Sequence, residues 1–245
     1  MNEISLIIPA AGSGTRMGGT IPKALVPING MTLVEFATLT LMPLCREIIM
    51  LVSPSTLDVF KGALPKIQNI DVQYIVQEIP RGTAEAVQIG LNYADSDFSV
   101  IMWADHIGAH FFSPSVLQEF WYSDTWDVVV PVLYREDPYV YFDIDEDGSI
   151  VGFNETRMGA TKQAFGWSDC GVFLVRNTVI RSALQRLATV AEAEVNFLAL
   201  FPLLNKMGLR VTTKIVDDHR LTLGANSFEE LTMVLNEFGD KETEV

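Results

Sequence analysis

The chain has 245 residues, a net charge of −14 and 49% hydrophobic residues. This length suits one α/β domain, and the apolar content is enough for a large core. The acidic balance disfavours a nucleic-acid surface, because phosphate backbones attract basic patches. No apolar stretch reaches the roughly 18 residues that span a bilayer, and the first residues do not form a signal segment. The chain has only two cysteines and is large enough to fold without a disulfide, so we expect both thiols to be reduced. We therefore expect a cytoplasmic protein that binds neither nucleic acid nor membrane.

The first half of the chain alternates short β-branched runs with helical patterns. Strands are expected over residues 3–9, 47–52, 72–77, 99–102 and 127–132, and helices over 32–43, 55–63, 83–93 and 113–122. This alternation predicts a parallel sheet covered on both faces. Ligands of such sheets bind beyond the carboxyl ends of the strands, which is where Gly12 and Asp105 would lie.

The pattern changes in the second half. Strands expected over 139–145 and 150–155 flank an Asp-Gly pair, which is a strong hairpin signal. A strand over 171–175, helices over 178–188 and 194–206, a strand over 210–216 and a helix over 227–238 complete the pattern. No internal repeat or linker is evident. We expect a single domain over residues 1–238 and a polar tail over 239–245.

Residues 9–23, PAAGSGTRMGGTIPK, carry the most specific signal. Their glycines permit backbone conformations closed to other residues, so that successive N–H groups can converge on phosphate oxygens. Arg16 offers a guanidinium fork that matches phosphate oxygens, and Lys23 offers a mobile point charge. A loop of this composition is suited to holding a nucleoside triphosphate.

Two better-known phosphate loops do not fit these residues. The P-loop needs Gly-x4-Gly-Lys-Ser/Thr, and no such string occurs in the chain. The dinucleotide fingerprint needs a third glycine at position 17, where Met17 stands. An ordinary glycine-rich turn from strand to helix is the simpler alternative, and Arg16 and Lys23 argue against it.

Several blocks together resemble the sugar-phosphate nucleotidyltransferase family, within it most closely the uridyltransferase domains that act on N-acetylglucosamine 1-phosphate. The blocks are AAGSGTRM with the following Pro-Lys at 22–23, QEIPRGTAEAV at 77–87, and Trp-Ala-Asp at 103–105. Glu155 and the Gly-Ala-Asn of 224–226 follow in the family's order, so that the resemblance spans roughly residues 3–238.

The resemblance implies a fold and an activity. The fold is a three-layer α/β/α arrangement with a mostly parallel mixed sheet, the Rossmann-like, GT-A-like nucleotide-diphospho-sugar transferase fold, with a β-hairpin insertion. The activity is that of a magnesium-dependent nucleotidyltransferase (pyrophosphorylase) of sugar nucleotide biosynthesis. It transfers a nucleoside monophosphate from an NTP, with UTP favoured, to a sugar 1-phosphate and releases pyrophosphate. The partners are the nucleoside triphosphate and a phosphorylated sugar or alcohol, and the oligomeric state, homo-oligomers included, is left open.

The family's nucleotide contacts carry over onto matching positions. Lys23 would bridge the α-phosphate and the incoming phosphate, and Arg16 would hold the leaving pyrophosphate. Gln77 and Gly82 would recognise the base, and Thr83 begins the helix that follows, where it could also be a simple cap. The backbone of the first loop would contact the nucleotide at Ala10, Ala11, Gly12 and Gly14.

The metal and the sugar would be held further along the chain. Asp105, directly after an apolar strand, and Asn226 would bind Mg²⁺, which prefers oxygen ligands and keeps several waters. Glu155 and Asp169 would contact the sugar phosphate. His106 and His110 could suggest zinc, but Gly108 weakens a helical pairing, and loop histidines near the substrate are the favoured interpretation.

The sugar side departs from the closest relatives. Asp169 stands where they have asparagine, and the bulky residues 139–142 stand where they have glycine. These departures put N-acetylglucosamine 1-phosphate in doubt. Two alternatives therefore stay open: a cytidylyltransferase acting on phosphocholine or another small phosphoester, and a non-catalytic nucleotide-binding regulatory paralogue. The presence of Arg16, Lys23, Asp105 and Asn226 together argues against the second.

Overall fold

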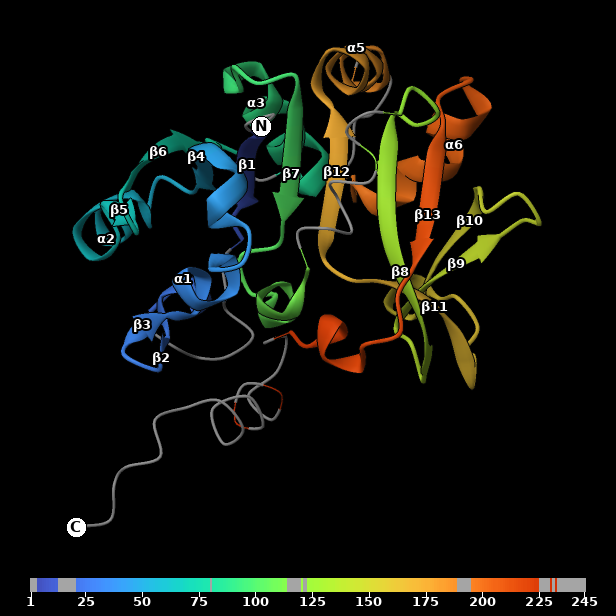
Figure 1. Cartoon of the computed structure of the whole chain (residues 1–245), viewed down its shortest axis with the longest axis horizontal. Helices are drawn as coiled ribbons and strands as arrows, with labels where there is room; N and C mark the ends of the chain where they lie inside the picture. Colours follow the sequence, from blue (N-terminus) through green and yellow to red (C-terminus); the bar gives the residue numbers. More distant parts are fainter. Residues whose placement is uncertain are drawn as a thin grey trace.

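One mixed sheet crosses the protein, and helices cover both of its faces (Figure 1). The computed structural model describes residues 4–12, 21–79, 81–113, 120, 123–188, 195–224, 230 and 232. The strand order is β10-β9-β11-β8-β12-β7-β1-β4-β6-β5, and β13 also pairs with β8. None of the helices in this part of the chain has the length and apolarity that crossing a membrane requires.

The first half of the chain builds a parallel block in the order β6-β4-β1-β7. Its strands are β1 (Ile4–Pro9), β4 (Cys45–Val52), β6 (Ile70–Val76) and β7 (Phe98–Met102). The helices that connect them are α1 (Leu33–Thr38), α2 (Leu57–Ala63) and α3 (Thr83–Tyr93). The central strands are almost wholly apolar because both faces of the sheet are buried. Four of the five strands predicted for a parallel sheet form this block, whereas the fifth, expected over 127–132, pairs with antiparallel neighbours in the second half of the chain.

The helix predicted over 32–43 is shorter than expected. It starts with a capping box, in which Thr32 and Glu35 satisfy each other's backbone N–H groups. It ends at Thr38, and a 3-10 turn, η3 (Met42–Leu44), follows. Pro43 accounts for the break, because proline clashes with a preceding helical turn and lacks an N–H donor.

Side chains of the parallel strands alternate between two cores. Leu6 and Ile8 face the layer that contains α1 and α2, where Phe60 is fully buried. Ile7 faces the other layer, which contains Val87 of α3. The same second layer holds α5 (Asn177–Ala188) and α6 (Phe201–Lys206). The three-layer arrangement predicted from the sequence is therefore present.

The second half of the chain extends the sheet with mostly antiparallel strands: β8 (Val128–Glu136), β9 (Val140–Ile144), β10 (Ile150–Glu155), β11 (Phe165–Asp169), β12 (Val172–Arg176) and β13 (Val211–Ile215). The predicted hairpin joins β9 to β10. Gly148 adopts φ +79° in its turn, and the Asp145 carboxylate accepts hydrogen bonds from the N–H groups of Asp147 and Ser149. Strand β11 was not predicted; it pairs with β8, which therefore extends four residues past the predicted end at 132 to Glu136.

The segment predicted as a helix over 194–206 is divided. Its described residues form a 3-10 turn, η6 (Leu198–Leu200), followed by α6. Before that turn, the side chains of Thr83 and Asn196 accept hydrogen bonds from the N–H groups of Phe197 and Leu198. These side chains compete with helical hydrogen bonding and hold the chain across the start of α3.

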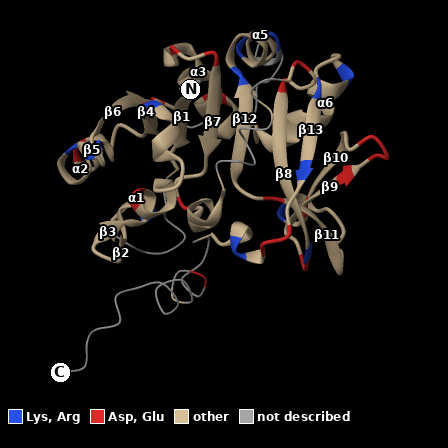
Figure 2. Ribbon diagram, in the orientation of Figure 1, with Lys and Arg blue, Asp and Glu red and all other residues tan. Residues whose placement is uncertain are grey.

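Short elements complete the described residues: β2 (Pro27–Ile28), β3 (Met31–Thr32), β5 (Lys66–Ile67), η2 (Lys23–Leu25), η4 (Ile107–Phe111), η5 (Thr156–Met158) and η7 (His219–Thr222). The predicted helix over 227–238 lies almost wholly outside the described residues, as does most of that over 113–122. Figure 2 shows acidic positions at the turn between β9 and β10, and basic positions dispersed over several elements.

Candidate active site

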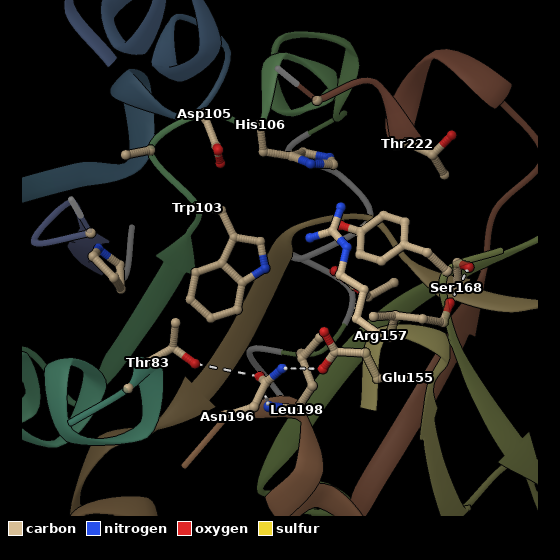
Figure 3. Close-up of a pocket in the computed structure, with 18 of the residues that line it drawn as sticks. Thr83, Trp103, Asp105, His106, Glu155, Arg157, Ser168, Asn196, Leu198 and Thr222 are labelled. Atoms are coloured by element: carbon tan, nitrogen blue, oxygen red, sulfur yellow. Dashed lines mark hydrogen bonds between the residues drawn. The ribbon is translucent and has the colours of Figure 1, made fainter. Parts of the chain in front are cut away.

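A cleft of about 600 Å³ lies between the parallel block and the antiparallel strands. On one side it is bounded by the chain that leaves β1, β6 and β7, and on the other by β10 and β11 (Figure 3). Residues far apart in the sequence therefore meet here. Of the residues predicted for the site, those that line the cleft are Ala11, Gly12, Gln77, Gly82, Thr83, Asp105, Glu155 and Asp169.

Four other predicted residues do not line the cleft or lie outside the described part of the chain. Ala10 lies behind the cleft, where its N–H donates to Leu51 O at 2.7 Å and its side chain packs against the core. Gly14, Arg16 and Asn226 fall outside the described residues. Gly12 faces open space, because a Cβ added there would have no described atom within 4 Å. The backbone of the first loop is thus accessible at this point.

Lys23 and Asp105 come together at one end of the cleft. Lys23 opens η2, and Asp105 follows the end of β7. Lys23 Nζ lies 3.5 Å from Asp105 Oδ2, with side-chain exposures of 15% and 34% respectively. Gly12 and Asp105, which were predicted to lie beyond the carboxyl ends of the strands, both line this cleft. The Lys23–Asp105 pair places a cation and a carboxylate within reach of the same ligand.

Gln77 and the turn before α3 form another wall. Gln77 leaves β6, where its N–H donates to Val52 O at 2.9 Å. Its Nε2 donates to Glu85 Oε2 at 2.7 Å and to Gly82 O at 3.4 Å. Gly82 has φ +94°, and a Cβ there would lie 2.3 Å from Val195 O. Glycine is therefore required on both conformational and steric grounds.

A hydrogen-bonded bridge crosses the floor of the cleft from α3 to β10. Thr83 Oγ1 donates to Asn196 Oδ1 at 3.4 Å, and Asn196 Nδ2 donates to Glu155 Oε2 at 3.4 Å (Figure 3). Thr83 is the first residue of the helix, whereas Gly82 occupies the cap position. Asn196 was not predicted; the available signal was a single amide within an otherwise apolar run.

The end of the cleft near β11 combines buried charges with aromatic rings. Burial raises the pKa of Asp169, although the electrostatic interaction with His106 and a 2.9 Å hydrogen bond from the Gly171 N–H act against the rise. Burial, followed by the negative charges of Asp169 and Asp105, raises the pKa of Tyr139 to about 12. The Arg157 guanidinium lies 4.8 Å from the centre of the Tyr139 ring.

Trp103, Tyr139, Arg157 and Arg135 also line the cleft and were not predicted as site residues. Figure 3 shows Trp103 in the middle of the cleft, between Asp105 on one side and Thr83 and Asn196 on the other. Two of the bulky residues noted at 139–142 differ in whether they reach the cleft. Tyr139 reaches the cleft, whereas Tyr141 is buried and donates to Thr161 O at 2.8 Å.

The two histidines after Asp105 each contact a backbone carbonyl. His106 Nε2 lies 2.7 Å from Leu221 O, and since a carbonyl only accepts, this nitrogen carries a proton. His110 Nδ1 lies 2.9 Å from Phe36 O, and its ring stacks on Phe36. His106 lines the cleft. Among the described residues, no group of three or more His, Cys, Asp or Glu side chains is arranged to hold a metal ion.

Residues 6–147, more than half of the chain, match the family model of the MobA-like NTP transferase domain. The chain therefore belongs to this family and is a nucleotidyltransferase. The resemblance to sugar-phosphate nucleotidyltransferases stated from its motifs is confirmed.

Among curated proteins, the bifunctional protein GlmU of Mycolicibacterium vanbaalenii is 28% identical over 249 residues, which cover 96% of this chain and 51% of the relative. The bifunctional protein GlmU of Buchnera aphidicola is 34% identical over 104 residues, which cover 42% of this chain and 22% of the relative. The chain spans about half the length of the first of these relatives.

Solved structures share the fold. The inositol-1-phosphate CTP transferase from T. maritima superposes with a TM-score of 0.71 at 18% identity, over 96% of this chain and 97% of its own. HddC from Yersinia pseudotuberculosis has a TM-score of 0.68 at 19% identity, over 96% of this chain and 99% of its own. At these identities the likeness establishes the fold, which is the predicted nucleotidyltransferase fold.

Proposed function

We propose that this nucleotidyltransferase transfers a nucleoside monophosphate from UTP to a sugar 1-phosphate and releases pyrophosphate. One observation carries the proposal. A single cleft is lined by Gly12 after β1, by Gln77 and Gly82, by Asp105, which pairs with Lys23, and by the carboxylates of Glu155 and Asp169. These are the groups that a nucleotide and a phosphorylated sugar would need on either side of the reacting phosphorus.

The reaction needs positioning and charge compensation rather than a protein nucleophile. An oxygen of the sugar phosphate attacks the α-phosphorus of the triphosphate, the new P–O bond forms, and the bond to the β-phosphate breaks so that pyrophosphate leaves. Both reactants are anions, so their repulsion is a large part of the barrier. Lys23, which lies in a sheltered position at the cleft's end, would neutralise the α-phosphate and the incoming phosphate. Arg16 would hold the leaving pyrophosphate.

The base would be held against Gln77 and Gly82. The pairing edge of uracil offers an N–H between two carbonyl oxygens. The Gln77 side-chain oxygen can accept from that N–H, and the backbone N–H of Gly82 can donate to a neighbouring carbonyl. A pyrimidine triphosphate would then extend its phosphates toward Gly12 and Lys23.

Mg²⁺ fits the donor set on this side of the cleft. Asp105 presents a partly exposed carboxylate at the exit of β7. Its partner Lys23 would have to move away from this carboxylate, or share it, when Mg²⁺ binds. Mg²⁺ prefers oxygen ligands and is commonly held by one or two carboxylates plus substrate phosphates. We propose that Asp105 and Asn226 hold it. When bound, it would neutralise charge on the triphosphate.

The acceptor would occupy the end of the cleft formed by β10 and β11. The carboxylates of Glu155 and Asp169 can accept hydrogen bonds from sugar hydroxyls, and Arg157 and Arg135 can pair with phosphate oxygens. Tyr139, a bulky residue at this end of the cleft, favours a smaller acceptor and hence a second candidate, cytidylyl transfer to a small phosphoester. A structural neighbour of this chain is named as a CTP transferase that acts on inositol 1-phosphate, which is a small phosphoester.

A substrate matrix tests the proposal. Purified protein with Mg²⁺ is given each of the four ribonucleoside triphosphates or dTTP, against a panel of phosphorylated sugars, phosphocholine and inositol phosphate, and pyrophosphate release is measured. We expect the highest kcat/KM with UTP and a sugar 1-phosphate. A CTP-specific product would select the second candidate, and tight nucleotide binding without pyrophosphate release from any pair would contradict catalysis.

A further inference from the structure

Glu85, in the first turn of α3, holds the Gln77 side chain at the wall of the cleft. Gln77 Nε2 donates a 2.7 Å hydrogen bond to Glu85 Oε2 and a longer one of 3.4 Å to Gly82 O. The backbone N–H of Arg81 donates to the same Glu85 oxygen at 3.3 Å. Glu85 therefore joins the end of β6, the intervening turn and the start of α3. Gln77 is only 3% exposed, so its side chain has little room to rearrange.

These contacts determine which end of the amide faces the cleft. The Glu85 carboxylate and the Gly82 carbonyl are both acceptors, so both require the NH₂ end of Gln77. A reversed amide would bring its oxygen against two acceptors in a buried position, which is unfavourable. The side-chain oxygen remains for a ligand, and no donor in the described part of the chain reaches it.

We infer that Glu85 makes Gln77 an obligate acceptor toward the base and thereby selects nucleobases that carry an N–H on their pairing edge. The inference rests on the proposed function and specifies its nucleotide. Uracil and thymine carry N3–H, which the Gln77 oxygen can accept. Cytosine has a lone pair at N3, which that oxygen repels. Without Glu85, the amide can reverse and donate its NH₂ to the cytosine N3, so discrimination between the two bases falls.

Glu85 is thus a positioning residue, and base preference is the property that its loss should alter. The test compares wild type with Glu85→Ala, with Glu85→Gln, and with a control, Glu78→Ala. Glu78 is next to Gln77 in the chain but exposed to solvent. Kd for UTP and for CTP is measured by titration calorimetry with Mg²⁺, and kcat/KM for both is measured by pyrophosphate release.

We expect wild type to prefer UTP and Glu85→Ala to reduce the UTP-to-CTP preference about tenfold, the worth of one net hydrogen bond. Glu85→Gln, whose side-chain oxygen can still accept from Gln77, should retain the preference within about threefold, and Glu78→Ala should leave it unchanged. The base preference of the wild type carries the test should Glu85→Ala not fold, because the inference requires a preference for UTP over CTP.

Two results would overturn the inference: a wild-type preference for CTP, or a folded Glu85→Ala variant with an unchanged ratio. In the second case nucleotidyl transfer from UTP by the wild type would still be measured, so the proposed function would stand. A wild-type preference for CTP would instead select its second candidate, cytidylyl transfer. A wild-type protein that neither binds nor turns over any nucleotide would overturn the proposed function together with this inference.

Discussion

The proposed chemistry of the cleft depends on individual residues, above all on the ion pair between Lys23 and Asp105. In the absence of substrate, the lysine is held 3.5 Å from the carboxylate and is largely shielded from solvent. When a triphosphate and its Mg²⁺ bind, this ion pair would be replaced by two contacts: Mg²⁺ would bind Asp105, and the α-phosphate would bind Lys23. The pair would therefore hold both groups in place before substrate arrives, which lowers the cost of arranging them during the reaction.

Replacing Lys23 with alanine should lower turnover much more than nucleotide binding. We expect kcat to fall about 10²–10³-fold, because a preorganised donor to the developing charge is lost. Kd for UTP should rise less than about tenfold, since the base and the other phosphate contacts remain. Lys61→Ala, an exposed lysine of α2, is the control. A Lys23→Ala enzyme with wild-type kcat would remove this residue from the mechanism.

Asn196 connects the nucleotide side of the cleft to the acceptor side. It accepts from Thr83 and donates to Glu155, both at 3.4 Å. Asn196→Ala should leave Glu155 free to change rotamer, so we expect KM for the sugar 1-phosphate to rise about tenfold while KM for UTP changes little. Asn92→Ala, an exposed position of α3, is the matched control. Equal effects on both KM values would contradict a role on the acceptor side.

At the scale of elements, the start of α3 and residues 195–197 form one unit. Backbone hydrogen bonds run from Val195 N to Arg81 O and from Ala84 N to Val195 O, both at 3.1 Å. Gly82 lies within this crossing, where any side chain would collide with the Val195 backbone. The packing of the two segments therefore fixes the turn that carries the proposed base contacts.

Gly82→Ala and Gly159→Ala form a matched pair that tests this crossing. The two glycines have φ of +94° and +93°, but a Cβ at Gly159 meets nothing within 4 Å. Positive φ penalises both changes, whereas overpacking penalises only Gly82→Ala, by a further roughly 1–3 kcal/mol. Urea denaturation should show this difference in the free energy of unfolding, and Kd for UTP should rise in Gly82→Ala alone. Equal destabilisation of the two variants would show that the contact with Val195 is unimportant.

The parallel pairing of β13 with β8 is anchored by Asp127 and Arg210, which precede these strands. Arg210 Nε and its backbone N–H both donate to Asp127 Oδ2, at 3.1 and 2.9 Å. Burial acts to raise the pKa of Asp127, but these hydrogen bonds and the charges of Arg210 and Arg176 outweigh it, so that the pKa is lowered. Ionised Asp127 therefore stabilises the folded chain.

Asp127→Ala should lower the free energy of unfolding by about 1–2 kcal/mol, a modest loss because Arg210 is half exposed. A lowered pKa gives stabilisation that is present above the unfolded-state value of about 3.9 and is lost as the pH falls through the folded-state value. The difference between variant and wild type should thus be constant from about pH 6 to 8 and shrink below about pH 4. Urea titrations followed by circular dichroism would measure it, and a difference that grows in acid would contradict the assignment.

At the scale of the whole molecule, local sequence patterns were enough to predict the parallel strands and the position of the site beyond their carboxyl ends. Apolar strands ending in Gly12, Gln77 and Asp105 must bring those residues to one sheet edge. Strand β11 was missed, since its five residues gain their stability from β8, far away in sequence.

Asn196 and Glu85 could not be assigned for a similar reason. Their partners, Glu155 and Gln77, are identified by the fold and not by sequence spacing alone. In the same way, the split of the segment over 194–206 depends on the Thr83 hydroxyl, more than 100 residues earlier. Side chains that act through distant partners leave little trace in a single sequence.

We propose that one cleft holds the nucleotide between Gly12, Gln77 and the Lys23–Asp105 pair. A crystal structure with Mg²⁺ and a non-hydrolysable UTP analogue would show where the nucleotide binds. We expect the uracil edge against the Gln77 oxygen, the phosphates beside Gly12 and Lys23, and the metal ion on Asp105. Well-ordered nucleotide bound elsewhere, with the cleft occupied by solvent alone, would contradict the account.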